Sequence, residues 1–253
     1  MATYFGEIIE PNSRCFVTDG EECSIENRYS LESDIVTTDE EVQTHEYVLV
    51  ACGKIMHDFV TTFLVSNHTK VVEKYSIVLK PSDSDKYTKK KMTYTLYNLT
   101  ANTLLFVCEQ LPHLYFANSL LVKLKPWIEK AKHTILLTTD HMSNFKPRGG
   151  LQPFMRSLRT NCCTMKVESP NLELPNTISG LPAAVMSWCQ GHKKSAVVYT
   201  VYVESPHLDS IIAEPLLHLM KTPHLCHLPI SQDTNKLQVI IHNAQLQNSN
   251  LYL

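Results

Sequence analysis

Cys52 and His57 are a pair of residues whose types and spacing could support catalysis. Cys52 ends an apolar run, Gly53 follows it, and His57 lies about one turn into the helical pattern that begins there. Strand-to-helix turns present the nucleophile in many α/β enzymes, so an acyl-transfer Cys/His pair is one interpretation. A buried thiol at the end of a strand is the simpler one, because nothing in the sequence points to a lowered thiol pKa. We therefore assign no catalytic residue.

A second group of chemically capable side chains gathers near the C-terminus. It consists of His218, His224, Cys226 and His227. Imidazole and thiolate are ligands of structural zinc sites, but the spacings His-x2-His and His-x-Cys are not typical of such sites. Prolines flank the group on both sides. We predict a proline-bounded loop with ordinary histidines, and neither a metal nor a cofactor.

Composition and missing motifs exclude several functional classes. The chain has only seven glycines, and it contains no GxGxxG, GxxxxGK[ST] or GxSxG motif for a nucleotide or a nucleophile elbow. Its net charge is −2, and its one basic run, Lys89–Lys91, is typical of a solvated turn, so we expect no nucleic-acid partner. No stretch approaches the roughly 20 apolar residues of a membrane span, so we expect no membrane insertion.

The last three residues form the sharpest local signal. Leu251, Tyr252 and Leu253 follow the polar segment 247–250 and end in a free carboxylate. A tail docked on its own core is one explanation. The other is capture in a pocket of a partner, where a cation and backbone donors receive the carboxylate and the amphipathic tyrosine is buried. We predict Leu251, Tyr252 and Leu253 as protein-binding residues.

The elements that would position these residues belong to an α/β fold. Four short runs are apolar almost without alternation, as in strands buried on both faces: Tyr47–Cys52, Leu104–Cys108, Thr134–Leu137 and Ala196–Val203. Helical patterns alternate with these runs at Ile55–Ser66, Ser119–Lys132 and Leu181–His192, and a fourth begins after Ser205-Pro206. We expect Asn118 to cap the second helix. We expect Pro215 to kink or interrupt the fourth. Two alternating segments, Val71–Leu79 and Met92–Leu99, suggest a hairpin-like excursion.

We therefore predict a single-domain αβα sandwich around a largely parallel sheet. Its core is residues 46–243, after an apolar N-terminal segment (1–10) and an acidic, mobile linker (11–45), and before a flexible C-terminal tail (244–253). Residues 19–41 carry nine acidic side chains against one basic one, with few apolar residues to offset the entropy of ordering. The eight cysteines include several within apolar runs, which favours free thiols in a reducing compartment, the cytoplasm or the nucleus.

Several stretches together resemble the proteasome assembly chaperone 1 family. They are MATYFGEIIE at the start, ILLTTDHMSNFK, PFMRSLRT, LPAAVMSWCQ (Leu181–Gln190) and NSNLYL at the end. The similarity runs along the whole chain in the same order, which makes it more specific than any single motif.

The resemblance implies a chaperone without enzymatic activity. Such a protein forms a heterodimer with a homologous chaperone, proteasome assembly chaperone 2, and binds the α-subunit ring during 20S proteasome assembly. The family's tail motif, hydrophobic-Tyr-X (HbYX), falls on Leu251, Tyr252 and Leu253, and inserts into a pocket between α-subunits. The alternative left open by the residues is a small cytosolic α/β hydrolase or transferase that uses Cys52 and His57.

Overall fold

A computed structural model describes residues 29–34, 44–66, 68–79, 91–109, 114–146 and 153–230. The chain divides into two compact units. The smaller unit comprises residues 1–33 and 76–92, and the larger comprises residues 34–75 and 93–253. The predicted apolar N-terminal segment and the C-terminal tail lie outside the described residues.

Four parallel strands form the centre of the sheet in the larger unit. In spatial order they are β5 (Thr103–Cys108), β2 (Tyr47–Cys52), β6 (His133–His141) and β8 (Ser195–Val203). Next to β5 lies β4 (Lys91–Thr100), which is antiparallel to it, and β3 (Lys70–Leu79) lies beyond β4. Next to β8 lies β7 (Phe154–Arg159), which is antiparallel to it. The predicted largely parallel sheet is confirmed, and β3 and β4 are neighbours, as the predicted hairpin requires.

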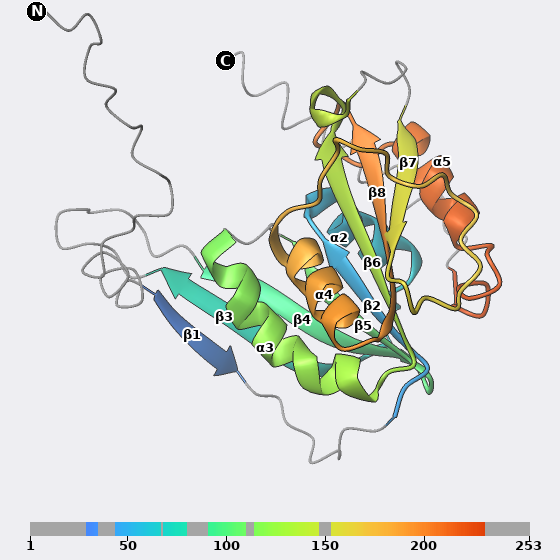
Figure 1. Cartoon of the computed structure of the whole chain (residues 1–253). Coiled ribbons are helices and arrows are strands. Elements are labelled where there is room, and N and C mark those ends of the chain that lie inside the picture. The colour runs from blue at the N-terminus through green and yellow to red at the C-terminus, as the bar shows by residue number, and fades with distance from the viewer. Residues whose placement is uncertain are drawn as a thin grey trace, which may run out of the picture. The chain divides into compact units, whose positions relative to one another are not determined.

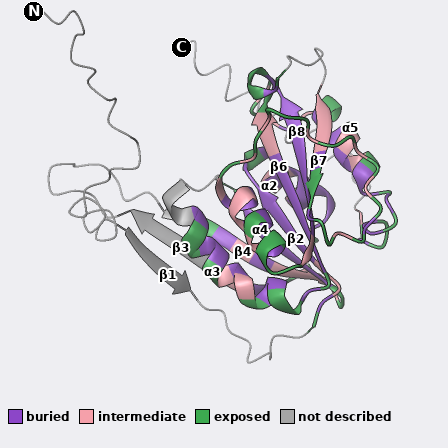
Figure 2. Cartoon of the chain, in the orientation of Figure 1, coloured by how far each residue is buried: buried purple, intermediate pink, exposed green. Residues whose placement is uncertain are grey.

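The four predicted apolar runs all form central strands, and the sheet extends some of them. Almost every residue of β2, β5, β6 and β8 is buried, whichever face its side chain occupies (Figure 2). A parallel strand with helices over both faces has no solvent-facing side, which explains why these segments do not alternate.

Helices cover both faces of this sheet (Figure 1). Those on one face are α2 (Lys54–Phe63) and α5 (Ser210–Leu219), and those on the other are α3 (Leu114–Lys130) and α4 (Gly180–Gly191). A short 3-10 turn, η1 (Met142–Asn144), follows β6. The predicted αβα layering is therefore present in the larger unit.

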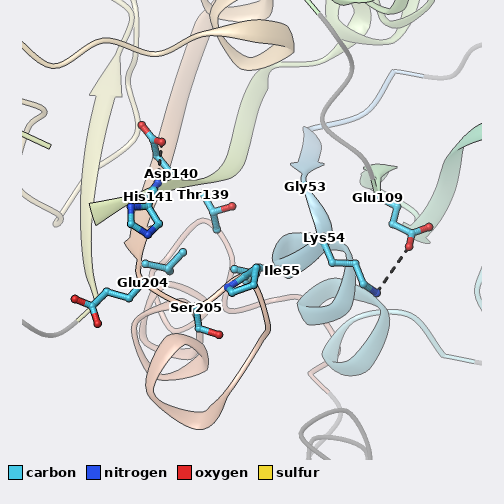
Figure 3. Close-up of a pocket in the computed structure, with 11 residues that line it drawn as sticks. Gly53, Lys54, Ile55, Glu109, Thr139, Asp140, His141, Glu204 and Ser205 are labelled. Carbon is cyan, nitrogen blue, oxygen red and sulfur yellow. Dashed lines mark hydrogen bonds and ion pairs between the residues drawn. The ribbon is translucent and has the colours of Figure 1, made fainter. Parts of the chain in front are cut away.

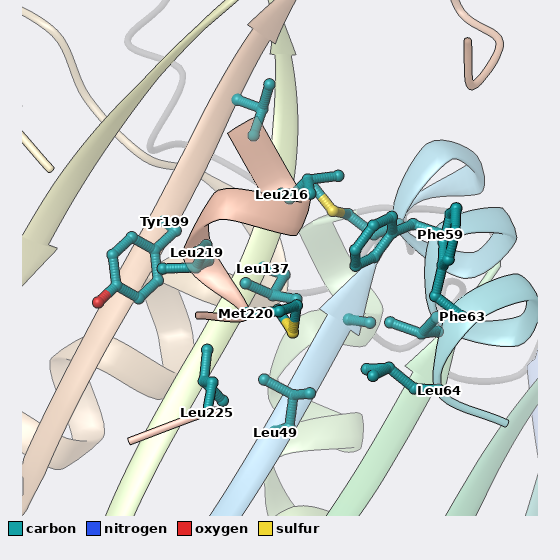
Figure 4. Packing of buried hydrophobic residues seen from close by; sticks show 14 of the residues in the cluster. Leu49, Phe59, Phe63, Leu64, Leu137, Tyr199, Leu216, Leu219, Met220 and Leu225 are labelled. Atoms are coloured by element: carbon teal, nitrogen blue, oxygen red, sulfur yellow. The ribbon is translucent and has the colours of Figure 1, made fainter. Parts of the chain in front are cut away.

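The principal core lies between the sheet and the α2–α5 layer (Figure 4). Odd-numbered strand residues such as Leu49, Leu137 and Tyr199 meet Phe59 of α2 and Leu216 of α5, and all five are fully buried. Even-numbered residues of the same strands point to the opposite face, because side chains alternate along a strand. Each strand thus contributes to two cores at once.

Two predicted helix starts were wrong. The helix expected after Ser205-Pro206 begins only at Ser210, because the Asp209 side chain caps it by accepting a hydrogen bond from the Ile212 amide at 2.7 Å. The helix runs on through Pro215, which we expected to kink or interrupt it. The helix expected from Ser119 already begins at Leu114, so Asn118 is an exposed residue within α3 and not its cap.

Two strands were missed or misassigned. In the smaller unit, β1 (Tyr29–Asp34) neighbours β3, although we predicted the surrounding acidic segment as a mobile linker. Tyr29 and Leu31 alternate with polar residues, and pairing with a neighbour supplies the backbone partners that such a short segment lacks alone. The edge strand β7, with sequence FMRSLR, was not predicted because its apolar and charged residues follow no clear period.

Two adjacent isoleucines of α5 provide a matched test of this packing. Ile212 is 1% exposed and belongs to the principal core, whereas Ile211 is 56% exposed. Ile212→Ala should lower the free energy of unfolding by about 2–5 kcal/mol, through lost burial and a residual cavity. Ile211→Ala should change it by roughly 0.5 kcal/mol or less, with the same change in helix propensity. Urea unfolding measures both, and equal losses in the two variants would contradict the orientation of α5.

Candidate functional site

The structure separates the two members of the possible Cys/His pair. Cys52 is fully buried and follows Val48 and Val50 on the sheet face opposite α2, whereas His57 belongs to α2 itself. Burial raises the pKa of the Cys52 thiol to about 12. A thiol that is neutral, enclosed and on the far side of the sheet from the histidine cannot act as its nucleophilic partner.

His57 has a different partner. Its Nδ1 atom lies 3.1 Å from Oδ1 of Asp58, which also accepts a hydrogen bond from Lys54 Nζ at 2.8 Å. Burial opposes ionisation of Asp58, but the hydrogen bonds and charges of His57 and Lys54 outweigh it and hold the pKa of this carboxyl below its usual value. This is a surface charge cluster at the start of α2.

A pocket lies at the carboxyl ends of the central strands, where ligands commonly bind in α/β sheets (Figure 3). Its volume is about 670 Å³. Residues from the strand ends and the first turn of α2 line it: Gly53, Lys54, Ile55, Glu109, Thr139, Asp140, His141, Val203, Glu204, Ser205 and Pro206.

The polar groups of this pocket are mostly engaged with one another. Lys54 Nζ bridges Asp58 and Glu109 at 2.8 and 3.7 Å, and Asp140 Oδ1 accepts hydrogen bonds from the His141 amide and from Asn144. Ser205 Oγ accepts a hydrogen bond from the His207 amide at 3.2 Å. His141 Nδ1 lies 2.7 Å from Ser143 Oγ and also accepts a hydrogen bond from the Ser143 amide, so this contact caps the short 3-10 turn after β6.

The histidine-rich C-terminal group splits in the folded chain. His224 is buried, whereas His218, Cys226 and His227 are exposed. Within the described ranges, no three His, Cys, Asp or Glu side chains come close enough to bind a metal ion together. In the same part of the chain, no helix has both the length and the apolar composition needed to cross a bilayer.

His224 and His227 contact strand residues that the sequence analysis did not single out. The ring of His227 lies 5.2 Å from that of Tyr47, and Tyr47 stacks on His133 at 5.4 Å. Tyr47 and His133 each begin a strand, and parallel pairing in register brings them together. In the sequence, these residues are visible only as a polar or aromatic residue at the start of each apolar run. The order of the strands in the sheet is needed to show that they lie next to one another.

The predicted protein-binding residues Leu251, Tyr252 and Leu253 lie outside the described residues, as do Lys89 and Lys90 of the basic run. The described chain reaches Ile230, which packs against the principal core. The tail prediction therefore stays a prediction.

Thiol labelling tests the burial of Cys52. Raising its pKa from 9.0 to about 12 leaves roughly a thousandfold less thiolate at pH 8, and burial also blocks access. Brief treatment of the native protein with iodoacetamide should modify the exposed Cys162 and Cys226 and spare Cys52. Mass spectrometry of the peptides identifies which cysteines are modified. Urea-unfolded protein is the control, in which Cys52 should also react. Fast labelling of Cys52 in the folded protein would instead support the nucleophile hypothesis.

Known proteins resemble the chain in sequence over much of its length. A family model labelled PAC1 and described as proteasome assembly chaperone 4 matches residues 25–253. Proteasome assembly chaperone 1 of Danio rerio is 37% identical over 115 residues, which cover 46% of this chain and 39% of that relative. Its counterpart in Homo sapiens is 31% identical over 170 residues, covering 62% of this chain and 57% of that relative. The chain thus aligns with only part of these curated relatives.

Several solved structures have a fold similar to that of this chain. Pyrococcus furiosus PbaB, an archaeal proteasome activator, matches with a TM-score of 0.56 and 11% identity, over 89% of this chain and 98% of that one. Pyrococcus furiosus PbaA, an archaeal homolog of proteasome-assembly chaperone, matches with a TM-score of 0.56 and 10% identity, over 88% and 92%. At such identities the similarity concerns the fold alone. The family model, in contrast, covers nearly the whole sequence, and the chain belongs to the proteasome assembly chaperone 1 family.

Proposed function

We propose that this protein promotes assembly of the 20S proteasome as half of a heterodimer with a second, homologous chaperone, proteasome assembly chaperone 2. The heterodimer binds the α-subunit ring. The observation that carries the proposal is the family match, which extends from residue 25 to the last residue and so includes the tail. The candidate pair Cys52 and His57 is separated by the sheet, and Cys52 is buried, which is consistent with a binding function rather than with thiol catalysis.

The tail supplies the specific contact in this proposal. Leu251 and Tyr252 fill a pocket between α-subunits, and the terminal carboxylate of Leu253 meets a cation there. Residues 244–253 can extend roughly 30 Å, enough to reach a groove while the folded body rests on the ring. Burying two side chains contributes a few kcal/mol, less the entropy of ordering the tail.

Such a contact is weak by itself but strong as one part of a multivalent complex. Once the body and the partner chaperone are docked, insertion of the tail becomes an intramolecular step, which can raise affinity by orders of magnitude. We further propose the cytoplasm or the nucleus as the site of action. The six cysteines in the described part of the chain are all free thiols, which suits a reducing compartment.

The tail mechanism predicts a loss of ring binding without a loss of the heterodimer. Tyr252→Ala, or deletion of residues 251–253, should weaken binding to the α-ring about tenfold or more, because both remove buried apolar contact. Pull-down of α-ring intermediates measures the effect, and size-exclusion chromatography of the heterodimer is the control. Unchanged ring binding in both variants would contradict the role of the tail.

Adding one glycine after Leu253 separates the two parts of the mechanism. The extension keeps all apolar area but displaces the carboxylate from its cation, so ring binding should fall nearly as far as with Tyr252→Ala. The same pull-down measures it. If the extended protein binds as well as the native one, carboxylate capture is wrong even though the chaperone function can stand.

Co-expression tests the heterodimer. A chain whose partner surface is left open should be poorly soluble or self-associated alone, and soluble as a 1:1 complex with the second chaperone. Light scattering on the protein purified with and without the partner gives the mass of each species. A well-behaved monomer that does not bind the second chaperone would refute this part of the proposal.

A further inference from the structure

A row of side chains crosses the amino ends of the four parallel strands. It consists of Thr103, Tyr47, His133 and Ser195, the first residues of β5, β2, β6 and β8, which pair in register from one strand to the next. Residues paired in this way point to the same face of a sheet. Neighbours interact directly: the rings of Tyr47 and His133 stack at 5.4 Å, and His133 Nδ1 lies 2.9 Å from Ser195 Oγ.

The segment after α5, residues 222–228, contacts this row, and we call it the latch. His227 Nε2 lies 3.1 Å from Thr103 Oγ1, and the His227 ring packs 5.2 Å from Tyr47. Leu225 and Leu228 of the latch are buried in the principal core. The latch is thus attached to the sheet by apolar side chains and by the His227 imidazole, which contacts the row.

His224 is the buried histidine of the latch. Its Nε2 atom lies 3.2 Å from the Tyr199 hydroxyl and 3.3 Å from Thr222 Oγ1, and its ring lies 6.5 Å from that of Tyr199. Thr222 Oγ1 donates its proton to the Leu219 carbonyl oxygen at 2.6 Å. The Tyr199 hydroxyl can donate to an unprotonated Nε2 atom, and protonation of that nitrogen would reverse the roles, so that Nε2–H donates to the hydroxyl oxygen.

Three imidazoles therefore lie around the row, and they affect one another. Burial lowers the pKa of His224, as do the nearby His133 and His227, while Glu168 opposes the shift. Burial also lowers the pKa of His133, as does Lys132, while Glu46 opposes the shift. The closed arrangement favours neutral imidazoles at both positions.

The two carboxylates that oppose these shifts are poorly placed to neutralise a buried imidazolium. Glu46 has a side chain 40% exposed and lies 3.7 Å from Lys132 Nζ, and the Glu168 side chain is 54% exposed and lies 3.5 Å from Lys166 Nζ. Each carboxylate is therefore solvated and already near a lysine. Among the described residues, the thiols of Cys226 and Cys163 lie near Tyr47 and Tyr199, and burial raises the pKa of both of these phenols.

We propose that residues 222–228 are a proton-sensitive latch, closed over the amino ends of the parallel strands when His133 and His224 are neutral and released when they gain protons. Protonation places positive charges near one another in a poorly solvated space, which is unfavourable. Residues 231–253 follow the latch in the sequence. If the proposed insertion of the tail is right, release of the latch lengthens the chain from which the tail extends.

The sign of the pH dependence follows from the direction of the shifts. An open latch restores the ordinary histidine pKa of 6.5, whereas the closed latch holds the pKa values of His133 and His224 lower. The open form therefore binds more protons below pH 6.5. The closed form has its full stability above that pH and loses it as the pH falls toward the lowered values.

Hydrogen exchange on the full-length protein tests the latch without reference to the proteasome. Between pH 7.5 and 5.5, the opening constant of amides 222–228 should rise by up to about tenfold for each histidine with a lowered pKa, hence up to about a hundredfold. The rates are corrected for the intrinsic effect of pH, and the central strands β2 and β6 serve as the internal reference. Equal protection of the latch at both pH values would overturn the proposal.

Substitutions assign the effect to particular residues. The double variant His133→Gln and His224→Gln keeps groups that can hydrogen-bond but cannot be protonated, so the latch should lose most of its pH dependence. His218→Gln, a change at an exposed histidine of α5, is the matched control and should behave like the native chain. A double variant with undiminished pH dependence would show that other groups control the latch. Should that variant fail to fold, the native and His218→Gln profiles still decide whether the latch responds to protons.

Discussion

The burial of the four central strands on both faces is the constraint on which the rest of the larger unit depends. Because β2, β5, β6 and β8 have no side that faces water, helices must cover both faces, and apolar side chains must fill both cores. The same constraint leaves little room for polar groups along the strands. Most of the polar chemistry of the central sheet is therefore found where the strands begin and end.

The two ends of the parallel strands carry different groups. At the carboxyl ends, charged side chains such as Lys54, Glu109 and Asp140 surround an open pocket, in which solvent and ion pairs satisfy most charges. At the amino ends, Tyr47 and His133 are shielded by the segment that follows α5, so their neutral forms are favoured. The two ends of the strands therefore differ mainly in how deeply their ionisable groups are buried, and less in which groups they carry.

The same burial explains why we expect the thiols of the central strands to be unreactive. Cys52 and Cys108 are neighbours in register at the ends of β2 and β5, and burial raises the pKa of both thiols. They fill space as small apolar side chains do. The buried central strands give the larger unit a stable body.

The sequence by itself determined the elements whose pattern is dominated by burial. The runs VLVAC and AVVYTVYV predicted buried parallel strands, since strands covered on both faces must be apolar throughout, and LPAAVMSWCQ predicted α4 within a residue or two. The family resemblance was also readable from the sequence, because it rests on the order of residues along the chain.

Tertiary structure decided the features that depend on contacts between distant residues. The edge strands β1 and β7 depend on pairing with a neighbouring strand, which overrides weak periodicity. The separation of Cys52 from His57 follows from the face that each residue occupies. The row of Tyr47 and His133 needed the register between strands that are adjacent in space but more than 80 residues apart in the chain, and no local pattern encodes that register.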